Sequence, residues 1–81
     1  LPVTQRERGM VHLRYGTFLR GRERYEESEA ELIAAFNALS AGFGEQDPWT
    51  QTAIKALIEL FQVTGQVERA EEWQGKVASP P

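Results

Sequence analysis

Residues 15–19 read Tyr-Gly-Thr-Phe-Leu, and residues 57–61, which lie 42 positions further along the chain, read Leu-Ile-Glu-Leu-Phe. The same offset pairs further small and apolar residues: Val11 with Ala53, His12 with Ile54, Tyr25 with Val67, Ser28 with Ala70, and Ala35 with Val77. Two pairs do not match, Leu32 with Gln74 and Ala30 with Glu72. A fixed offset is the signature of a repeat, in which each unit is one supersecondary structure. We therefore expect two units, about residues 3–41 and 47–78.

Each unit contains two apolar stretches at helical spacing. The first helix is expected from Val3 to Gly21, and its apolar positions are Val11, Tyr15, Phe18 and Leu19. The second begins near Tyr25 and carries apolar residues at six positions: Ala30, Leu32, Ile33, Ala35, Phe36 and Leu39. The third runs through Ala53, Ile54, Leu57, Leu60 and Phe61 to about Thr64. The fourth starts near Val67, carries Ala70, Trp73 and Val77, and stops before Pro80.

Residues at the ends of these stretches are typical of helix boundaries. Gly42 and Gly44 are expected to end the second helix and Gly65 the third, because glycine adopts the left-handed backbone that closes a helix. Asp47 can cap the free amides of the third helix, and Pro48 fits its first turn. No segment shows strand alternation. The sequence predicts an all-α fold of four helices in one domain, residues 1–81, with an accidental repeat in a generic four-helix bundle as the alternative.

Residues 65–71, Gly-Gln-Val-Glu-Arg-Ala-Glu, resemble the turn and second-helix start of a tetratricopeptide repeat. Residues 24–29 form the matching passage in the first unit, where Ser28 is the small residue and Glu23 replaces the usual turn glycine. Gly16 stands where the family places another small residue. The 42-residue spacing is similar to the longer variant of kinesin light chains and bacterial arrays. The resemblance implies two tandem helical hairpins with antiparallel helices, stacked as a right-handed superhelix.

In this family the concave surface, lined by the first helix of each unit, binds a peptide or partner protein. Carried over position by position, the lining residues are Met10, Leu13, Thr17, Arg20, Thr52, Lys55, Glu59 and Gln62. Such a mixed surface suits an extended or helical peptide. The resemblance thus implies a protein-interaction or scaffold module with a protein or peptide partner. The alternative for these eight residues is that several of them only face solvent.

Catalytic and metal-binding chemistry is not expected from this sequence. His12 is the single histidine and there is no cysteine, so a metal or nucleophile site lacks partners. On the 42-residue register we expect His12 to be a partly buried packing residue. The glutamates of residues 26–31 are typical of a helix start, where the helix dipole favours negative charge. We therefore expect no enzyme activity, no metal and no cofactor.

The two tryptophans are expected to serve packing. Trp49 follows Pro48, where an aromatic side chain packs over the loop between the units. Trp73 lies on the last helix, where it either covers the end of the stack or contacts a missing neighbour. Because about three units are ordinarily needed for a stable solenoid, the ends of a two-unit stack also suggest homo-oligomerisation.

Net charge and length leave further alternatives open. The chain has a net charge of −3, yet residues 1–24 hold six of its nine basic residues. These arginines scatter around the helix circumference, so nucleic-acid binding through the first hairpin is the least favoured function.

No apolar run approaches the ~20 residues that span a bilayer, and we expect a cytoplasmic location in a bacterial-style protein. Because residue 1 is leucine, we expect a fragment of a longer protein. The second hypothesis is a regulatory or dimerisation segment attached to a catalytic domain such as a bacterial serine/threonine kinase.

Overall fold

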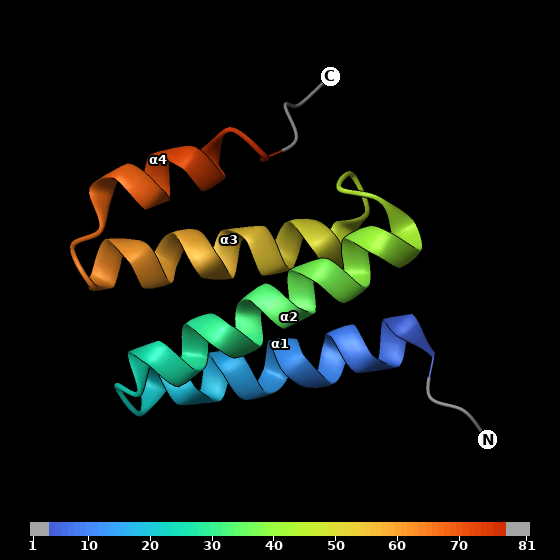
Figure 1. Cartoon of the computed structure of the whole chain (residues 1–81), viewed down its shortest axis with the longest axis horizontal. Coiled ribbons are helices and arrows are strands. Elements are labelled where there is room, and N and C mark those ends of the chain that lie inside the picture. Colours follow the sequence, from blue (N-terminus) through green and yellow to red (C-terminus); the bar gives the residue numbers. More distant parts are fainter. Residues whose placement is uncertain (1–3, 78–81) are drawn as a thin grey trace.

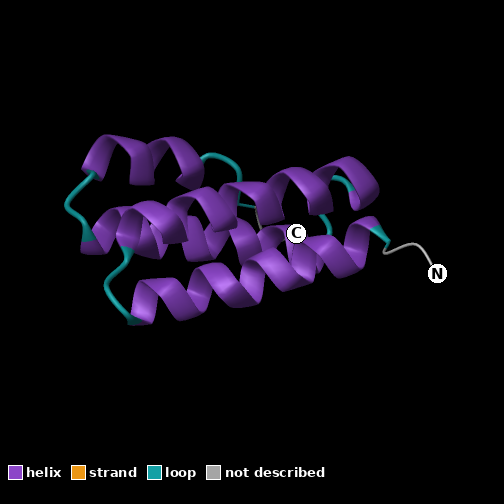
Figure 2. Ribbon diagram, turned by 60° about the horizontal axis from the view of Figure 1, so that its bottom comes forward, coloured by secondary structure: helices purple, strands orange, loops and turns teal. Residues whose placement is uncertain are grey.

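The computed structural model describes residues 4–77 and places four helices in them. Their bounds are α1, Gln5–Gly21; α2, Tyr25–Phe43; α3, Pro48–Val63; and α4, Val67–Gln74. Helices joined by short loops account for the whole described chain, and no strand occurs between residues 4 and 77 (Figure 2). The predicted all-α class with two helical hairpins is confirmed.

Each helix runs antiparallel to the next one in the chain, and the four follow one another across the molecule in sequence order (Figure 1). Helix α2 packs against both α1 and α3, α4 packs against α3, and α1 also touches α3. The molecule is a slab of 40 × 34 × 14 Å. Because α1 and α4 stand at the two ends of the row, their outer sides have no neighbouring helix among the described residues.

Helix α3 begins at the predicted capping residues. Asp47 Oδ2 accepts hydrogen bonds from the backbone nitrogens of Trp49, at 2.9 Å, and Thr50, at 3.4 Å. Pro48 occupies the first turn of α3, and Thr4 caps α1 through the backbone nitrogen of Glu7. Val3, the predicted start of the first helix, lies outside the described residues.

One predicted boundary was right only in part, and another was wrong. Gly42 does not end α2, because the helix continues to Phe43 and the backbone turns only at Gly44, where φ is 83°. Helix α4 does not reach Val77 but ends at Gln74, which is followed by Gly75. Glycine is a poor residue for a helix interior, so the last helix has only eight residues and its C-terminal turn is irregular.

The turns that close the two hairpins have the same backbone conformation at positions 42 residues apart. Glu23 has a φ of 61° and Gly65 a φ of 73°, both in the left-handed region. The residue after each donates its amide five positions back, Arg24 to the Leu19 oxygen at 2.9 Å and Gln66 to the Phe61 oxygen at 2.7 Å. The 42-residue register seen in the sequence therefore coincides with an equivalence of backbone geometry.

The core lies between α2 and α3 and extends to one residue each of α1 and α4. Its buried members are Leu13, Leu32, Ala35, Leu39, Ala53, Leu57, Leu60, Phe61 and Ala70. Fully burying one leucine or phenylalanine contributes about 1.5–3 kcal/mol, so this cluster supplies most of the apolar stabilisation. Trp73 is half-buried against the cluster, with its ring edge-on to Phe36 at 4.9 Å between centroids.

Small residues let α1 and α2 approach closely. Ser28 is fully buried and its hydroxyl donates to the Gly16 carbonyl at 2.7 Å. A Cβ atom at Gly16 would lie 2.7 Å from Leu32 Cγ and 3.2 Å from the Leu32 backbone nitrogen. Gly16 and Ser28, the small residues singled out in the sequence, are therefore contact residues between α1 and α2.

The predicted apolar face of the first helix was largely wrong. Leu19 is buried, but Val11, Tyr15 and Phe18 are exposed by 64%, 46% and 57% of their surface. The inner face of α1 instead carries Gly9, Leu13, Gly16 and Leu19. Helical spacing selected the large apolar residues of α1 and missed the face, built partly from glycines, that α2 covers.

Candidate functional site

A hollow of about 260 Å³ lies between the first helices of the two hairpins, α1 and α3. Its lining residues are Leu13, Thr17, Arg20, Thr52, Lys55, Ala56 and Glu59. Leu13 is buried and Ala56 half-buried, so these two supply its apolar part, while the remaining side chains are polar. We call this hollow the α1–α3 groove.

The structure brings together six of the eight residues predicted to line a binding surface. Gln62 instead lines a second hollow of about 260 Å³ between α3 and the C-terminal turn. Met10 lines neither hollow and is half-buried on α1. Sequence reasoning missed Ala56, although its position four residues after Thr52 puts it on the same face of α3.

Lys55 and Glu59 line both hollows. The second hollow is completed by Ile58, Gln62, Gln74 and Val77. Because the two residues are one helical turn apart on α3, they separate the α1–α3 groove from the hollow beside α4. The polar side chains of α3 can therefore be reached from both sides.

An ion pair crosses the groove from one helix to the other. The guanidinium of Arg20, on α1, donates to Glu59 Oε2, on α3, at 2.5 Å. The Glu59 side chain is 60% exposed, and ion pairs this open to solvent contribute only about 0–1 kcal/mol to stability. Because water screens the pair, a ligand carboxylate can compete with Glu59 for Arg20 at small cost.

Lys55 differs from Arg20 because no ion-pair or hydrogen-bond partner for it lies among residues 4–77. Within residues 4–77 its ammonium group takes part in no ion pair or hydrogen bond, and the side chain is exposed. An ammonium carries three donors and no acceptor. Lys55 therefore offers donors and a positive charge to any carbonyl or carboxylate in the groove.

The two threonines of the groove present acceptors. Thr17 Oγ1 donates to the Leu13 carbonyl at 2.8 Å, and Thr52 Oγ1 donates to the Pro48 carbonyl at 2.9 Å. Each hydroxyl proton is thus used within its own helix, while lone pairs of the oxygen stay free. The groove combines donors on Lys55, acceptors on the threonines and an apolar floor, which are the groups that a peptide backbone and its side chains require.

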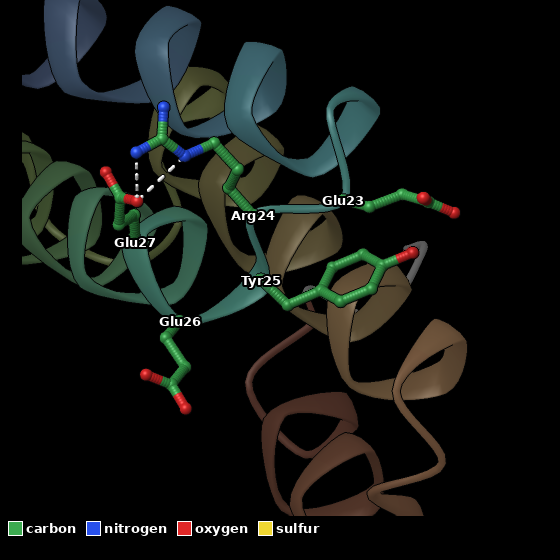
Figure 3. A pocket seen from close by; sticks show the side chains of 5 residues that line it. All are labelled: Glu23, Arg24, Tyr25, Glu26 and Glu27. Carbon is green, nitrogen blue, oxygen red and sulfur yellow. Dashed lines mark hydrogen bonds and ion pairs between the residues drawn. The ribbon is translucent and has the colours of Figure 1, made fainter.

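A wider hollow of about 450 Å³ surrounds the turn between α1 and α2. It is lined by residues 23–27, and Figure 3 shows Arg24 directed at Glu27 while Glu23 and Glu26 point away. Arg24 Nε donates to Glu27 Oε1 at 2.8 Å. An equivalent hollow surrounds residues 65–69, so the feature belongs to the turn geometry that the two hairpins share.

Two residues outside the groove, His12 and Gln51, have polar partners. His12 is half-buried, as expected, but its Nδ1 lies 2.6 Å from Glu31 Oε2 of α2, a contact that the sequence did not suggest. Trp49 is 37% exposed. Gln51 was missed altogether: it is buried, and its side-chain nitrogen donates to the carbonyls of Glu45 and Lys76 at 2.6 and 3.1 Å.

Two of the N-terminal arginines are engaged by carboxylates, Arg20 by Glu59 and Arg24 by Glu27. These pairs reduce the positive charge that the first hairpin offers to a phosphate backbone. No group of three or more metal-ligating side chains occurs within the described range, 4–77. None of the four described helices is long and apolar enough to cross a membrane.

Comparisons with protein-family models, with curated proteins and with solved structures find no match to this chain. The resemblance to tetratricopeptide repeats therefore stays a prediction from the sequence.

Proposed function

We propose that this chain is a protein-interaction module that holds a segment of a partner protein in the α1–α3 groove. The observation that carries the proposal is the convergence of Thr17, Thr52 and Lys55 around an apolar floor between two helices. The proposed partner segment is a peptide of mixed polarity, with an apolar side chain over Leu13 and a carbonyl or carboxylate at Lys55. Binding takes place by complementarity on a preformed surface, without catalysis or a cofactor. The tetratricopeptide-like architecture and the cytoplasmic location belong to the same proposal.

The size of the groove sets the affinity that we expect. A hollow of about 260 Å³ accommodates only a few peptide side chains. Short contacts of this kind fall below the area of a standard protein interface, so we expect dissociation constants in the range of about 1–100 μM. Tighter binding requires further contacts, such as those that the second hollow beside α4 provides.

Selection from a peptide library tests this proposal. We expect peptides selected on the wild-type chain to contain an apolar residue close to an acidic residue, because Lys55 is the unpaired cation of the groove. In a fluorescence-anisotropy titration, Lys55→Glu should weaken their binding at least about tenfold, since the introduced carboxylate repels the acidic residue of the peptide that Lys55 attracts. Lys55 is exposed, so the variant should keep its helical circular dichroism.

Arg6→Glu is the matched control. It makes the same change of charge on α1, outside the residues that line the groove, and should leave the affinity unchanged. Equal binding of the selected peptides to wild type and Lys55→Glu would refute the groove as the binding site.

A further inference from the structure

The outer side of α1 carries a continuous stripe of exposed apolar side chains, Val11, Tyr15 and Phe18, which we call the α1 stripe. The rings of Tyr15 and Phe18 are stacked, with centroids 6.4 Å apart and an angle of 13° between their planes. The guanidinium of Arg22 lies 5.9 Å from the centre of the Phe18 ring and extends the stripe toward the end of α1. Apolar surface gathered in one place, rather than scattered singly, is typical of an interaction site.

On the second hairpin, the face of α3 that corresponds to the α1 stripe is covered by a helix. Forty-two residues after the α1 stripe, α3 carries Ala53, Leu57 and Leu60, which are 0%, 0% and 1% exposed. They share one core cluster with three residues of α2: Leu32, Ala35 and Leu39. The face of α1 that is open in this chain is therefore the face that, on α3, is packed against a helix. Its natural occupant is an amphipathic helix of the α2 kind.

Charge at the edges of the α1 stripe restricts that helix further. Arg8 and Arg14 lie three residues to either side of Val11, and Arg22 lies four residues after Phe18, so all three are helical neighbours of the stripe. All are exposed, and none takes part in an ion pair between residues 4 and 77. Glu7 is the acidic residue that also borders the stripe, four residues before Val11. The border is thus positive in balance, although the chain as a whole is negative.

A second copy of the chain fits this surface poorly. Two α1 stripes packed against each other would bring Arg8, Arg14 and Arg22 of both copies together, and like charges at an interface are unfavourable. Helix α4 is the other candidate within a second copy, since it is the counterpart of α2. It has only eight residues and one largely exposed apolar side chain, Val67, so it offers little apolar surface to the contact.

We infer that the α1 stripe is a second docking surface, which binds an amphipathic α-helix of a partner protein whose apolar face is flanked by acidic residues. This surface is separate from the α1–α3 groove, because the groove is lined by Leu13, Thr17 and Arg20 of α1 and none of these belongs to the stripe. The chain then carries two contact surfaces of different kinds, one for a short peptide and one for a helix.

Two designed helical peptides test the inference on the full 81-residue chain. Both carry leucines at i, i+3/i+4 and i+7 spacing, and they differ only in whether glutamates or lysines flank the leucines. In an anisotropy titration we expect the glutamate peptide to bind at least about tenfold more tightly than the lysine peptide, with a difference that shrinks as salt is added.

Variants locate the binding surface. Phe18→Ser should weaken binding of the glutamate peptide at least about tenfold, because a ring that becomes buried on binding is lost. Val63→Ser, which removes a similarly exposed apolar side chain from α3, should have no effect, and neither should the groove variant Lys55→Glu. Phe18 is 57% exposed, so the variant should keep the wild-type helical circular dichroism and melting temperature.

Three results would overturn the inference. The first is equal affinity for the two peptides, and the second is unchanged binding by the folded Phe18→Ser variant. The third is a dimer of the chain alone in sedimentation equilibrium that Phe18→Ser dissociates, because the occupant would then be a second copy. Loss of binding by Lys55→Glu but not by Phe18→Ser would assign the helix to the groove instead.

Discussion

Glu23 and Gly65 hold the same left-handed backbone conformation in the two hairpin turns, but only one of them is a glycine. The left-handed region costs residues with a Cβ atom roughly 1–2 kcal/mol, whereas glycine adopts it freely. The Glu23 side chain makes no hydrogen bond or ion pair in the described part of the chain that would offset this cost. The first turn is therefore the more strained of the two.

Exchanging these residues should change stability in opposite directions. We expect Glu23→Gly to raise the free energy of unfolding by about 0.5–1 kcal/mol and Gly65→Glu to lower it by about 1–2 kcal/mol. Urea denaturation followed by circular dichroism measures both changes. Glu23→Ala is the control, because it removes the charge but keeps the backbone cost, and should bring no such gain. A stabilised Glu23→Ala variant would show that the charge of Glu23, not its backbone, is the unfavourable feature.

At the scale of the helices, the contact of α1 with α2 depends on the absence of a side chain at Gly16. Its neighbour Leu32 is fully buried and cannot move aside without disturbing the core. The buried hydrogen bond from Ser28 to the Gly16 carbonyl holds the two backbones at the same point. A larger residue at position 16 must push the helices apart and weaken this bond.

We expect Gly16→Ala to lower the free energy of unfolding by about 1–3 kcal/mol, although alanine favours a helix more than glycine does. Gly21→Ala is the matched control on the same helix. No atom outside its own neighbourhood lies within 4 Å of a Cβ at Gly21, so that variant should be neutral or more stable by up to ~1 kcal/mol. Thermal melts of the two variants provide the comparison. If both are stabilised equally, the close packing at Gly16 is not a constraint.

The sequence predicted the helices well because their ends are marked locally. Asp47, Pro48 and Gly65 act on the backbone within a few residues of themselves, and the structure confirms all three. Gln51 could not be predicted in the same way. Its partners are backbone carbonyls of Glu45 and Lys76, the second 25 positions away, and no side-chain pattern marks a backbone oxygen.

The larger error of the sequence prediction concerned the face of α1 that packs against α2. Tyr15 and Phe18 are larger than Gly9 and Gly16, so their spacing dominated the apolar pattern, yet the glycines face the core. Close helix contact needs small residues, which a search for apolar periodicity overlooks. The groove residues were easier to place, since the 42-residue register transfers a position on α1 to the equivalent position on α3.

At the scale of the whole molecule, the two proposed surfaces follow from a flat stack of two hairpins. Packing α2 between α1 and α3 buries the inner sides of both first helices and leaves the α1–α3 groove open between them. The exposed surface of α1 carries three large apolar side chains, Val11, Tyr15 and Phe18, whereas that of α4 carries one, Val67. The chain is thus an asymmetric module whose two ends present different chemistry.

The central claim, that the α1–α3 groove binds a peptide, is tested most directly by mapping a selected peptide on the chain with amide NMR spectra. We predict that the largest chemical-shift changes fall on Leu13, Thr17, Thr52 and Lys55, and that the Lys55→Glu variant shows no changes at the same peptide concentration. Largest changes at residues 23–27, or changes of equal size in the Lys55→Glu variant, would contradict the claim.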